Sequence, residues 1–227
     1  MSPERLARIN DVLNRRQPDL TLCMDQVHKA HNLSAVVRTA DAVGIHQVHA
    51  VFPKEGVRLR PHTAGGSLNW VKVNRHRDIA SAVTTLRQQG MQLVATHLSD
   101  SARDFRDIDY TRPTALLVGQ ELEGISQQAL DLADHHIMVP MVGMVQSLNV
   151  SVASALILFE AQRQRQLAGF YEHPRLAAAE RQRILFERGY PQLARQCRRK
   201  QLPYPGISPQ GDVQASDAWW QAMRSGA

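Results

Sequence analysis

The sequence lacks the features that mark several large classes of protein. Its 227 residues contain two cysteines, Cys23 and Cys197, and no zinc-like spacing of Cys and His. Neither a disulfide framework nor a structural zinc site is therefore expected, and sparse cysteine is typical of a reducing compartment. We accordingly expect a cytoplasmic protein. Cys23 lies in the apolar run LTLCM, which predicts a buried thiol.

Long apolar runs are also missing. No stretch approaches the ~20 apolar residues that a membrane-spanning helix needs. Residues 1–16 form a charged amphipathic pattern without the apolar core of a signal peptide. We therefore expect no membrane partner.

Signatures of other enzyme classes fail as well. No G-x-G-x-x-G follows the first apolar segment, which disfavours a dinucleotide-dependent oxidoreductase. Gly119 and Gly124 have the spacing of a phosphate-binding loop, but Ile125 stands where that loop needs lysine. The triplet 134–136, Asp-His-His, has no convincing set of partner ligands, so we predict no metal site.

Positive charge is concentrated near the C-terminus. Residues 163–200 carry ten basic and three acidic side chains, a net charge of +7, whereas the whole chain carries +6. A basic segment beside a nearly neutral body favours a polyanionic partner. A solvated helix face is the simpler interpretation, but the run Arg198, Arg199 and Lys200 weighs against it.

Apolar segments alternate with amphipathic helical ones, which predicts an α/β protein with a mostly parallel sheet covered on both faces. The expected strands are 21–24, 48–52, 70–73, 92–96, 114–118 and 137–139. The expected helices are 2–16, 33–43, 79–89, 126–133, 150–166, 176–188 and 217–223. Residues 54–69 show no periodicity and are expected to form a loop. We divide the chain into a helical N-terminal extension (1–19), a central domain (20–167) and a basic helical C-terminal extension (168–227).

Three segments carry the chemistry. Residues 137–160 read as a short strand, a Gly-containing loop and a helix that Ser147 and Asn149 introduce. Residues 31–45 place Asn32 and Arg38 six positions apart, and residues 116–126 read as a strand, a loop with Glu121, and a helix start. A strand that feeds a polar loop at a helix N-terminus is where open α/β sheets bind ligands.

In this order the three segments resemble the motifs of the SpoU family of RNA ribose 2′-O-methyltransferases, within the SPOUT superfamily. The resemblance covers nearly the whole chain. It implies a C-terminal trefoil knot in the sheet, a homodimer, and S-adenosylmethionine as the methyl donor. It further implies methylation of the ribose of guanosine 18 in the D-loop of tRNA. A ribosomal RNA methyltransferase of the same family and a non-catalytic RNA-binding protein are the alternatives.

The resemblance assigns catalytic positions to Arg38, Asn32, Glu121, Ser147 and Asn149. Arg38 is expected either to take the proton of the ribose hydroxyl or, because arginine is almost always charged, to act as a cationic clamp. A surface ion pair is the simpler role for Arg38. Asn32, Ser147 and Asn149 have the simpler role of capping a helix. The sequence departs from the family pattern at Leu122 and Glu123, where Lys-Thr is usual.

The resemblance also assigns the methyl-donor pocket. Its expected residues are Thr96, Gly119, Val139, Met144, Ser147, Leu148 and Asn149. Glycine at 119 would let a ligand approach the backbone closely, and the apolar members would form walls or simply pack in the core. Methyl transfer to a hydroxyl requires no metal. The residues expected to contact RNA phosphates are Arg8, Arg15, Arg16, Arg163, Arg195, Arg198, Arg199 and Lys200.

Overall fold

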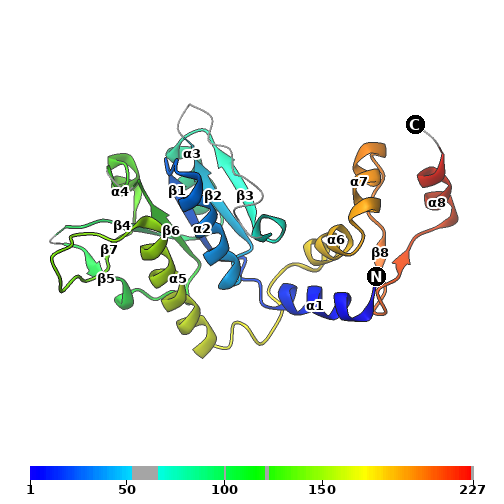
Figure 1. Ribbon diagram of the computed structural model, residues 1–227, viewed down its shortest axis with the longest axis horizontal. Helices are drawn as coiled ribbons and strands as arrows, with labels where there is room; N and C mark the ends of the chain where they lie inside the picture. Colours follow the sequence, from blue (N-terminus) through cyan, green and yellow to red (C-terminus); the bar gives the residue numbers. More distant parts are fainter. Residues whose placement is uncertain (53–65, 100, 121–122, 226–227) are drawn as a thin grey trace. The chain divides into compact units, whose positions relative to one another are not determined.

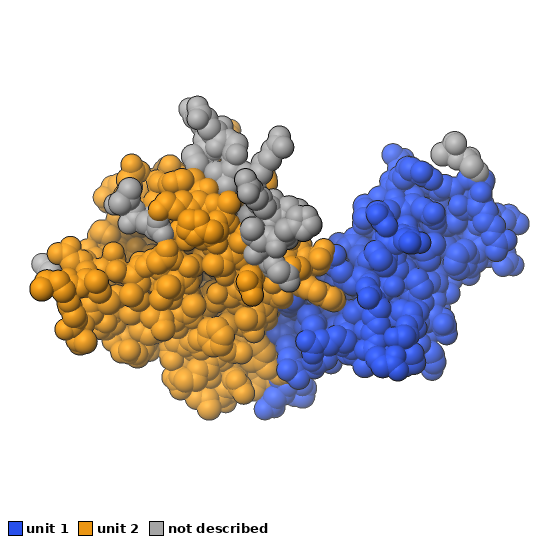
Figure 2. Space-filling model, viewed as in Figure 1, with its two compact units in different colours: residues 1–16, 172–227 blue, residues 17–171 orange. Residues whose placement is uncertain are grey.

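A computed structural model describes residues 1–52, 66–99, 101–120 and 123–225. The chain divides into two compact units, coloured separately in Figure 2. Unit 1 combines Met1–Arg16 with Glu172–Ala227, and unit 2 is Gln17–Tyr171. None of the helices in these described ranges combines the length and the apolar character that crossing a membrane would demand.

Unit 2 is built on a seven-stranded sheet in the order β3-β2-β1-β6-β4-β7-β5, with every neighbouring pair parallel (Figure 1). Its strands are β1 (Leu20–Asp25), β2 (Gln47–Val51), β3 (Lys72–His76), β4 (Gln92–Thr96), β5 (Arg103–Asp104), β6 (Thr114–Val118) and β7 (His135–Met138). The expectation of an α/β fold with a mostly parallel sheet is confirmed.

Helices cover both faces of this sheet. Helices α2 (Ala30–Ala42) and α5 (Val150–Leu167) pack on one face, and α3 (Ile79–Gln88) and α4 (Gln127–Leu132) on the other. Strand β6 is apolar from residue 115 to its end because it is buried on both faces: Leu116 and Val118 enter the α2–α5 core, while Ala115 and Leu117 enter the α3–α4 core. A strand buried on both faces has no polar side to alternate with.

The predicted elements recur with small shifts of their ends. Helix α2 begins at Ala30, three residues earlier than expected, so Asn32 lies in its first turn. Strand β5 and the 3₁₀ turn Phe105–Asp107 were not predicted, because such short elements leave no periodic pattern. Most of the loop expected at 54–69 falls outside the described residues, and Ser67–Asn69 forms a 3₁₀ turn.

Unit 1 brings the two ends of the chain together. It contains α1 (Pro3–Asn14), α6 (Ala178–Gly189), α7 (Pro191–Lys200), a small hairpin of β8 (Gly206–Ile207) and β9 (Val213–Gln214), and α8 (Asp217–Arg224). The guanidinium of Arg181, on α6, donates to the side-chain oxygens of Asn10 and Asn14 on α1. The two terminal segments, which the sequence analysis treats as separate extensions, thus form one compact unit.

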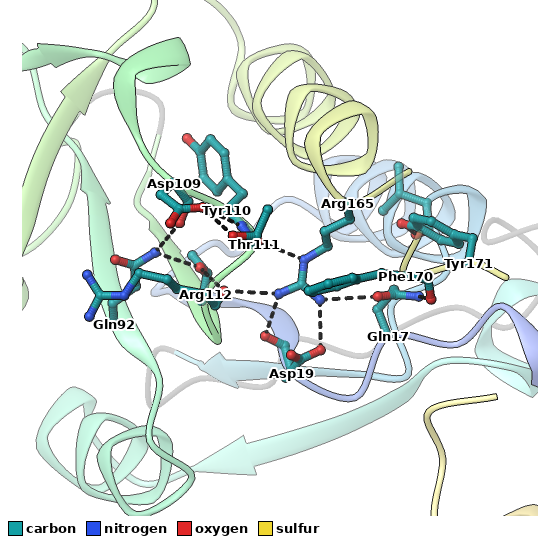
Figure 3. A network of polar contacts seen from close by, with 12 residues as sticks. Gln17, Asp19, Gln92, Asp109, Tyr110, Thr111, Arg112, Arg165, Phe170 and Tyr171 are labelled. Atoms are coloured by element: carbon teal, nitrogen blue, oxygen red, sulfur yellow. Dashed lines mark hydrogen bonds and ion pairs between the residues drawn. The ribbon is translucent and has the colours of Figure 1, made fainter. Parts of the chain in front are cut away.

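A buried arginine anchors α5 at the edge of the sheet where β1 and β6 begin (Figure 3). The side chain of Arg165 is fully buried, and its guanidinium contacts Asp19 at 2.7 Å. It also donates to Gln17 and to the backbone carbonyls of Asp19, Tyr110 and Arg112. All five N–H groups of the guanidinium therefore have an acceptor.

The chain that leaves α5 also fastens α2. Tyr171 donates its hydroxyl to the carbonyl of Val43 at 2.7 Å, at the C-terminal end of α2. Gln17 donates to the carbonyl of Phe170, whose ring lies 5.5 Å from the Arg165 guanidinium carbon. Helices α2 and α5 are thus both held at their C-terminal ends, which fixes where their N-terminal ends lie.

Candidate active site

The N-terminal ends of α2 and α5 meet at the opposite edge of the sheet, where the parallel strands end. The segments after β4, β6 and β7 surround a cavity of about 630 Å³ there. Its size falls within the range of small-molecule sites. It also lies where parallel α/β sheets bind ligands, beyond the carboxyl ends of the central strands.

Five of the seven residues predicted for the methyl donor line this cavity. They are Thr96, Gly119, Val139, Ser147 and Leu148. Met144 does not: its side chain is 98% exposed, and Met141 lines the cavity instead. Asn149 is not in the lining either, and it caps α5.

Two of these residues are constrained by the backbone around them. The Thr96 hydroxyl donates to the carbonyl of Leu117 at 3.3 Å and so ties the end of β4 to β6. A Cβ at Gly119 would lie 2.1 Å from the carbonyl oxygen of Gly124. The glycine is therefore required by a close backbone contact across the turn, not by the ligand approach that the sequence suggested.

A smaller cavity of about 210 Å³ adjoins the first. The two share Gln120, Glu123 and Val150 in their linings. The remaining residues of the smaller cavity are Val27, His28, Lys29 and Asn32. The geometry thus offers a large compartment and a small one side by side, which suits a reaction between two bound molecules.

Asn32 and Asn149 join α2 to α5 beside these cavities. The Oδ1 atom of Asn149 accepts from the backbone N–H of Ser151 at 2.9 Å and caps α5. Its Nδ2 donates to Oδ1 of Asn32 at 3.3 Å. The alternative that Asn32 only caps its helix is wrong, because the cap position is Lys29 and Asn32 is buried inside the first turn. For Asn149, capping and the contact with Asn32 coexist.

Arg38 lies on the exposed side of α2. Six residues along a helix correspond to an advance of about 9 Å and a rotation of about 240°, so Arg38 and Asn32 project in different directions. Within the described ranges the Arg38 guanidinium has neither a hydrogen bond nor an ion pair. A surface ion pair, the simpler role, is not seen there.

Two other predicted residues have different positions. Ser147 is exposed and lines the large cavity. Glu121 lies outside the described residues. Gln120 was not predicted: its Nε2 donates to Oε2 of Glu123 at 3.0 Å at the junction of both cavities. Its position shortly after the end of strand β6 was the signal in the sequence that could have pointed to it.

Among the described residues, no group of three His, Cys, Asp or Glu side chains is arranged to hold a metal.

The basic residues predicted to contact RNA fall into distinct groups. Arg16 is 2% exposed, so the prediction that it contacts RNA is not supported. Arg15 pairs with Asp11, and Arg163 pairs with Glu160, each at 2.8 Å. Arg8 is exposed, with Asp11 at 3.9 Å.

The other four predicted basic residues lie on α7. Arg198 donates to the hydroxyl of Tyr204 at 2.8 Å. Lys200 donates to backbone carbonyls at the end of α8. Arg195 and Arg199 are exposed, and inside the described part of the chain neither forms a hydrogen bond or an ion pair. They lie one helical turn apart and so share a face of α7.

Helix α5 also exposes apolar side chains. Val152, Leu156 and Phe159 are 47%, 43% and 51% exposed. Their spacing of four and three residues places them in one stripe along the helix. The stripe adds to the exposed Val142, Met144 and Val145 of the loop before α5. Unit 2 alone leaves this surface uncovered.

The family model described as "SpoU rRNA Methylase family" matches residues 19–159, and a second, "SpoU, rRNA methylase, C-terminal", matches residues 163–216. Helix α8 follows the last matched residue. The chain is 61% identical over 227 residues to a tRNA (guanosine(18)-2′-O)-methyltransferase of Escherichia coli strain K12, and the match covers 99% of both chains.

Solved structures of similar fold exist. One is a TrmH/SpoU tRNA modifying enzyme of Aquifex aeolicus, with a TM-score of 0.78 and 41% identity, covering 84% of this chain and 97% of that one. Another is an AdoMet-bound rRNA methyltransferase from Sinorhizobium meliloti, with a TM-score of 0.60 and 29% identity, covering 67% of this chain and 59% of that one.

Proposed function

Since the chain belongs to the SpoU methylase family, we propose that it methylates the ribose 2′-oxygen of guanosine 18 in the D-loop of tRNA, with S-adenosylmethionine as donor. The full-length similarity to a tRNA (guanosine(18)-2′-O)-methyltransferase supports the substrate. The observation that carries the chemistry is the pair of adjoining cavities at the carboxyl edge of the sheet. One compartment suits the donor, and the other suits the sugar that receives the methyl group.

The large cavity fits S-adenosylmethionine in size and character. Leu148, Ile137 and Val118 provide apolar walls, and the turn closed by Gly119 and Gly124 presents backbone groups beside them. S-adenosylmethionine, when bound, supplies an electrophilic methyl group. The protein's task is then to hold the accepting oxygen in line with that group and to exclude water. Thr96, Val139, Ser147 and Leu148 belong to this pocket.

The sugar enters the small cavity, where Asn32 is held by Asn149. Arg38 is the catalytic residue: its exposed guanidinium, supplied by the partner subunit, meets the 2′-oxygen as the hydroxyl proton passes to the solvent. Arginine keeps its charge at neutral pH, so the role of a cationic clamp that stabilises the developing negative charge is physically simpler than that of a base. Glu121 remains a proposed member of the site.

The active form is a homodimer. The apolar stripe of Val152, Leu156 and Phe159 on α5 supports this, since exposed apolar patches of this kind mark interfaces. Arg38 and Asn32 project in different directions from α2, which leaves Arg38 available to a site on the partner subunit. The trefoil knot and the cytoplasmic location are proposed on family resemblance and on the sparse cysteines.

Unit 1 binds the tRNA backbone. Arg195 and Arg199 form the central pair of phosphate contacts, since they are exposed and neither is engaged within the described residues. Arg8, Arg15 and Arg198 are further candidates in unit 1, and Arg163 is one in unit 2; each would exchange an internal partner for a phosphate. Arginine suits this task because its planar fork can bind two phosphate oxygens.

The test is transfer of a labelled methyl group to purified RNAs. A tRNA transcript should accept label at guanosine 18. The same transcript with a 2′-deoxyguanosine at that position should accept none, because the reacting oxygen is missing. Labelling of ribosomal RNA but not tRNA would favour the alternative activity within the family. Binding of tRNA without any methyl transfer would favour a non-catalytic RNA-binding protein.

A further inference from the structure

Helix α8 and Lys200 form a contact that the methylation site does not require. The Lys200 ammonium donates to the carbonyls of Ala222 and Met223 at 2.9 Å each, and to the carbonyl of Ser225. Ala222 and Met223 lie in the last turn of α8, whose carbonyls have no backbone N–H partner within the helix, and Ser225 is the cap residue, whose hydroxyl also donates to the carbonyl of Ala222. A lysine ammonium has three N–H donors, so all three are engaged.

These hydrogen bonds change the role that we expect for Lys200 in the basic run 198–200 at the end of α7. A cation at the C-terminal end of a helix is favoured by the helix dipole as well as by the hydrogen bonds. With three carbonyls already bound, Lys200 has no donor left for a phosphate. A second contact also holds α8: Trp219 is 9% exposed, and its indole N–H donates to the carbonyl of Pro203, which follows α7, at 2.9 Å.

Helix α7 needs such a support. It has ten residues, and buries only Ala194 and Cys197. A helix this short depends on packing for its stability. Its exposed arginines, at 195, 198 and 199, are neighbours on one helix and repel one another. Arg198 is neutralised by Glu187 at 3.5 Å, and the contact through Lys200 fixes the last turn to α8.

We propose that α8 is a brace that holds α7 in the orientation in which Arg195 and Arg199 contact tRNA phosphates, and that Lys200 is a positioning residue and not itself an RNA contact. The proposal rests on the proposed function, because it presumes that unit 1 binds tRNA. It assigns a role to residues 217–225 and reassigns Lys200, which the sequence predicted as a phosphate ligand.

Two variants test the brace: one removes a charge together with the brace, and the other removes the brace alone. Lys200→Met keeps the aliphatic stem and loses the ammonium, whereas Trp219→Ala loosens α8 and leaves every charge in place. Both should weaken binding of the full-length protein to tRNA about tenfold, as a loss of one or two well-placed phosphate contacts would. Lys200→Arg should largely restore binding, since its guanidinium can still donate to the carbonyls.

Methylation kinetics provide a second readout. Both variants should raise KM for tRNA and leave kcat and the affinity for S-adenosylmethionine unchanged, because the donor cavity lies in unit 2. Circular dichroism and thermal melting establish that unit 1 is folded. If Trp219→Ala unfolds unit 1, Trp219→Phe, which loses only the indole N–H bond, should show a smaller increase in KM for tRNA.

A double-mutant cycle separates bracing from direct contact. Arg199→Gln should cost less tRNA affinity in the Lys200→Met background than in the wild type, because an arginine that is no longer held in place contributes less. The proposal is overturned if the two effects add and Trp219→Ala binds tRNA normally, since Lys200 would then be an ordinary phosphate ligand. Failure of the wild-type protein to bind tRNA at all would instead refute the proposed function.

Discussion

Two arginines of unit 2 have opposite surroundings. At the edge of the sheet where β1 and β6 begin, Arg165 is fully buried, and each of its N–H groups has an acceptor (Figure 3). Arg38 is exposed on α2, lines neither cavity, and has no partner within the described residues. A satisfied guanidinium holds elements together, whereas one with unused donors is available to a ligand. Arg165 is therefore a structural anchor, whereas Arg38 is available for chemistry.

The largest effect is expected at Arg38. Arg38→Ala should lower the rate of methyl transfer by about 10³-fold, as loss of a group that stabilises developing charge does, while binding of S-adenosylmethionine changes little. Rates measured at saturating tRNA and donor, with calorimetric donor binding, test this. The control is Arg106→Ala, since Arg106 is also exposed but pairs with Asp104 at 3.1 Å. Undiminished turnover of Arg38→Ala would remove it from the mechanism.

Substitution of the buried Arg165 should instead affect folding. Arg165→Met removes the cation that contacts Asp19 and the donor to three backbone carbonyls, so we expect a loss of about 3–5 kcal/mol in the free energy of unfolding. Urea denaturation measures it. Arg163→Met is the matched control two residues away: its ion pair with Glu160 is at the surface, so the loss should be below about 1 kcal/mol. Equal losses of unfolding free energy in the two variants would contradict the contrast between the buried and the exposed arginine.

A buried histidine adds a third case, in which a polar atom is enclosed without a partner. Nδ1 of His49 lies 2.8 Å from Nε2 of His76, while Nε2 of His49 has no partner among the described residues. Burial, with smaller contributions from the neighbouring His76 and Lys72, lowers the pKa of His49 to about 4. The unfolded chain therefore takes up this proton at a higher pH than the folded chain does.

The stability contribution of neutral His49 is thus fully present above about pH 6.5 and is lost as pH falls toward 4. Between pH 8 and pH 5 this group should cost about 2 kcal/mol of unfolding free energy. Burial also lowers the pKa of His76, which acts in the same direction. Urea titrations at both pH values should show a smaller decrease for His49→Gln than for the wild type. An unchanged decrease would show that other groups dominate.

The smallest effect concerns the salt dependence of tRNA binding. Arg199→Gln removes one proposed phosphate contact, so the slope of log K against log salt should become shallower by about 0.7–0.9. Arg183→Gln is the control, because Arg183 is committed to Glu180 and Glu187 at 2.6 and 3.0 Å. It should leave the slope unchanged in a filter-binding series. A flat salt dependence in the wild type would argue against electrostatic binding altogether.

The sequence predicts the sheet well for a physical reason. Strands such as β6 are short, apolar and bounded by proline or glycine, and in a parallel sheet every such strand must be covered on both faces. The order β3-β2-β1-β6-β4-β7-β5 was not predicted, because no local pattern encodes which strands become neighbours. The same holds for Asn32, whose contact with Asn149 spans 117 residues.

The site was predicted in part. Residues next to a strand end, such as Thr96 and Gly119, were placed correctly in the cavity lining. Met144 was not, because an apolar residue in a loop gives no signal of whether it turns toward a pocket or toward solvent. Arg16 and Lys200 show the converse: charge in the sequence suggests exposure, but only the fold reveals the carbonyls and burial that engage it.

The asparagine pair has a directional consequence. An amide has one accepting end and one donating end, and Asn149 uses its oxygen on the backbone of α5, so its nitrogen must face Asn32. Asn32 in turn must present its oxygen to Asn149, which assigns the NH₂ end to its other side. The start of one helix thereby dictates the polarity of a side chain on another.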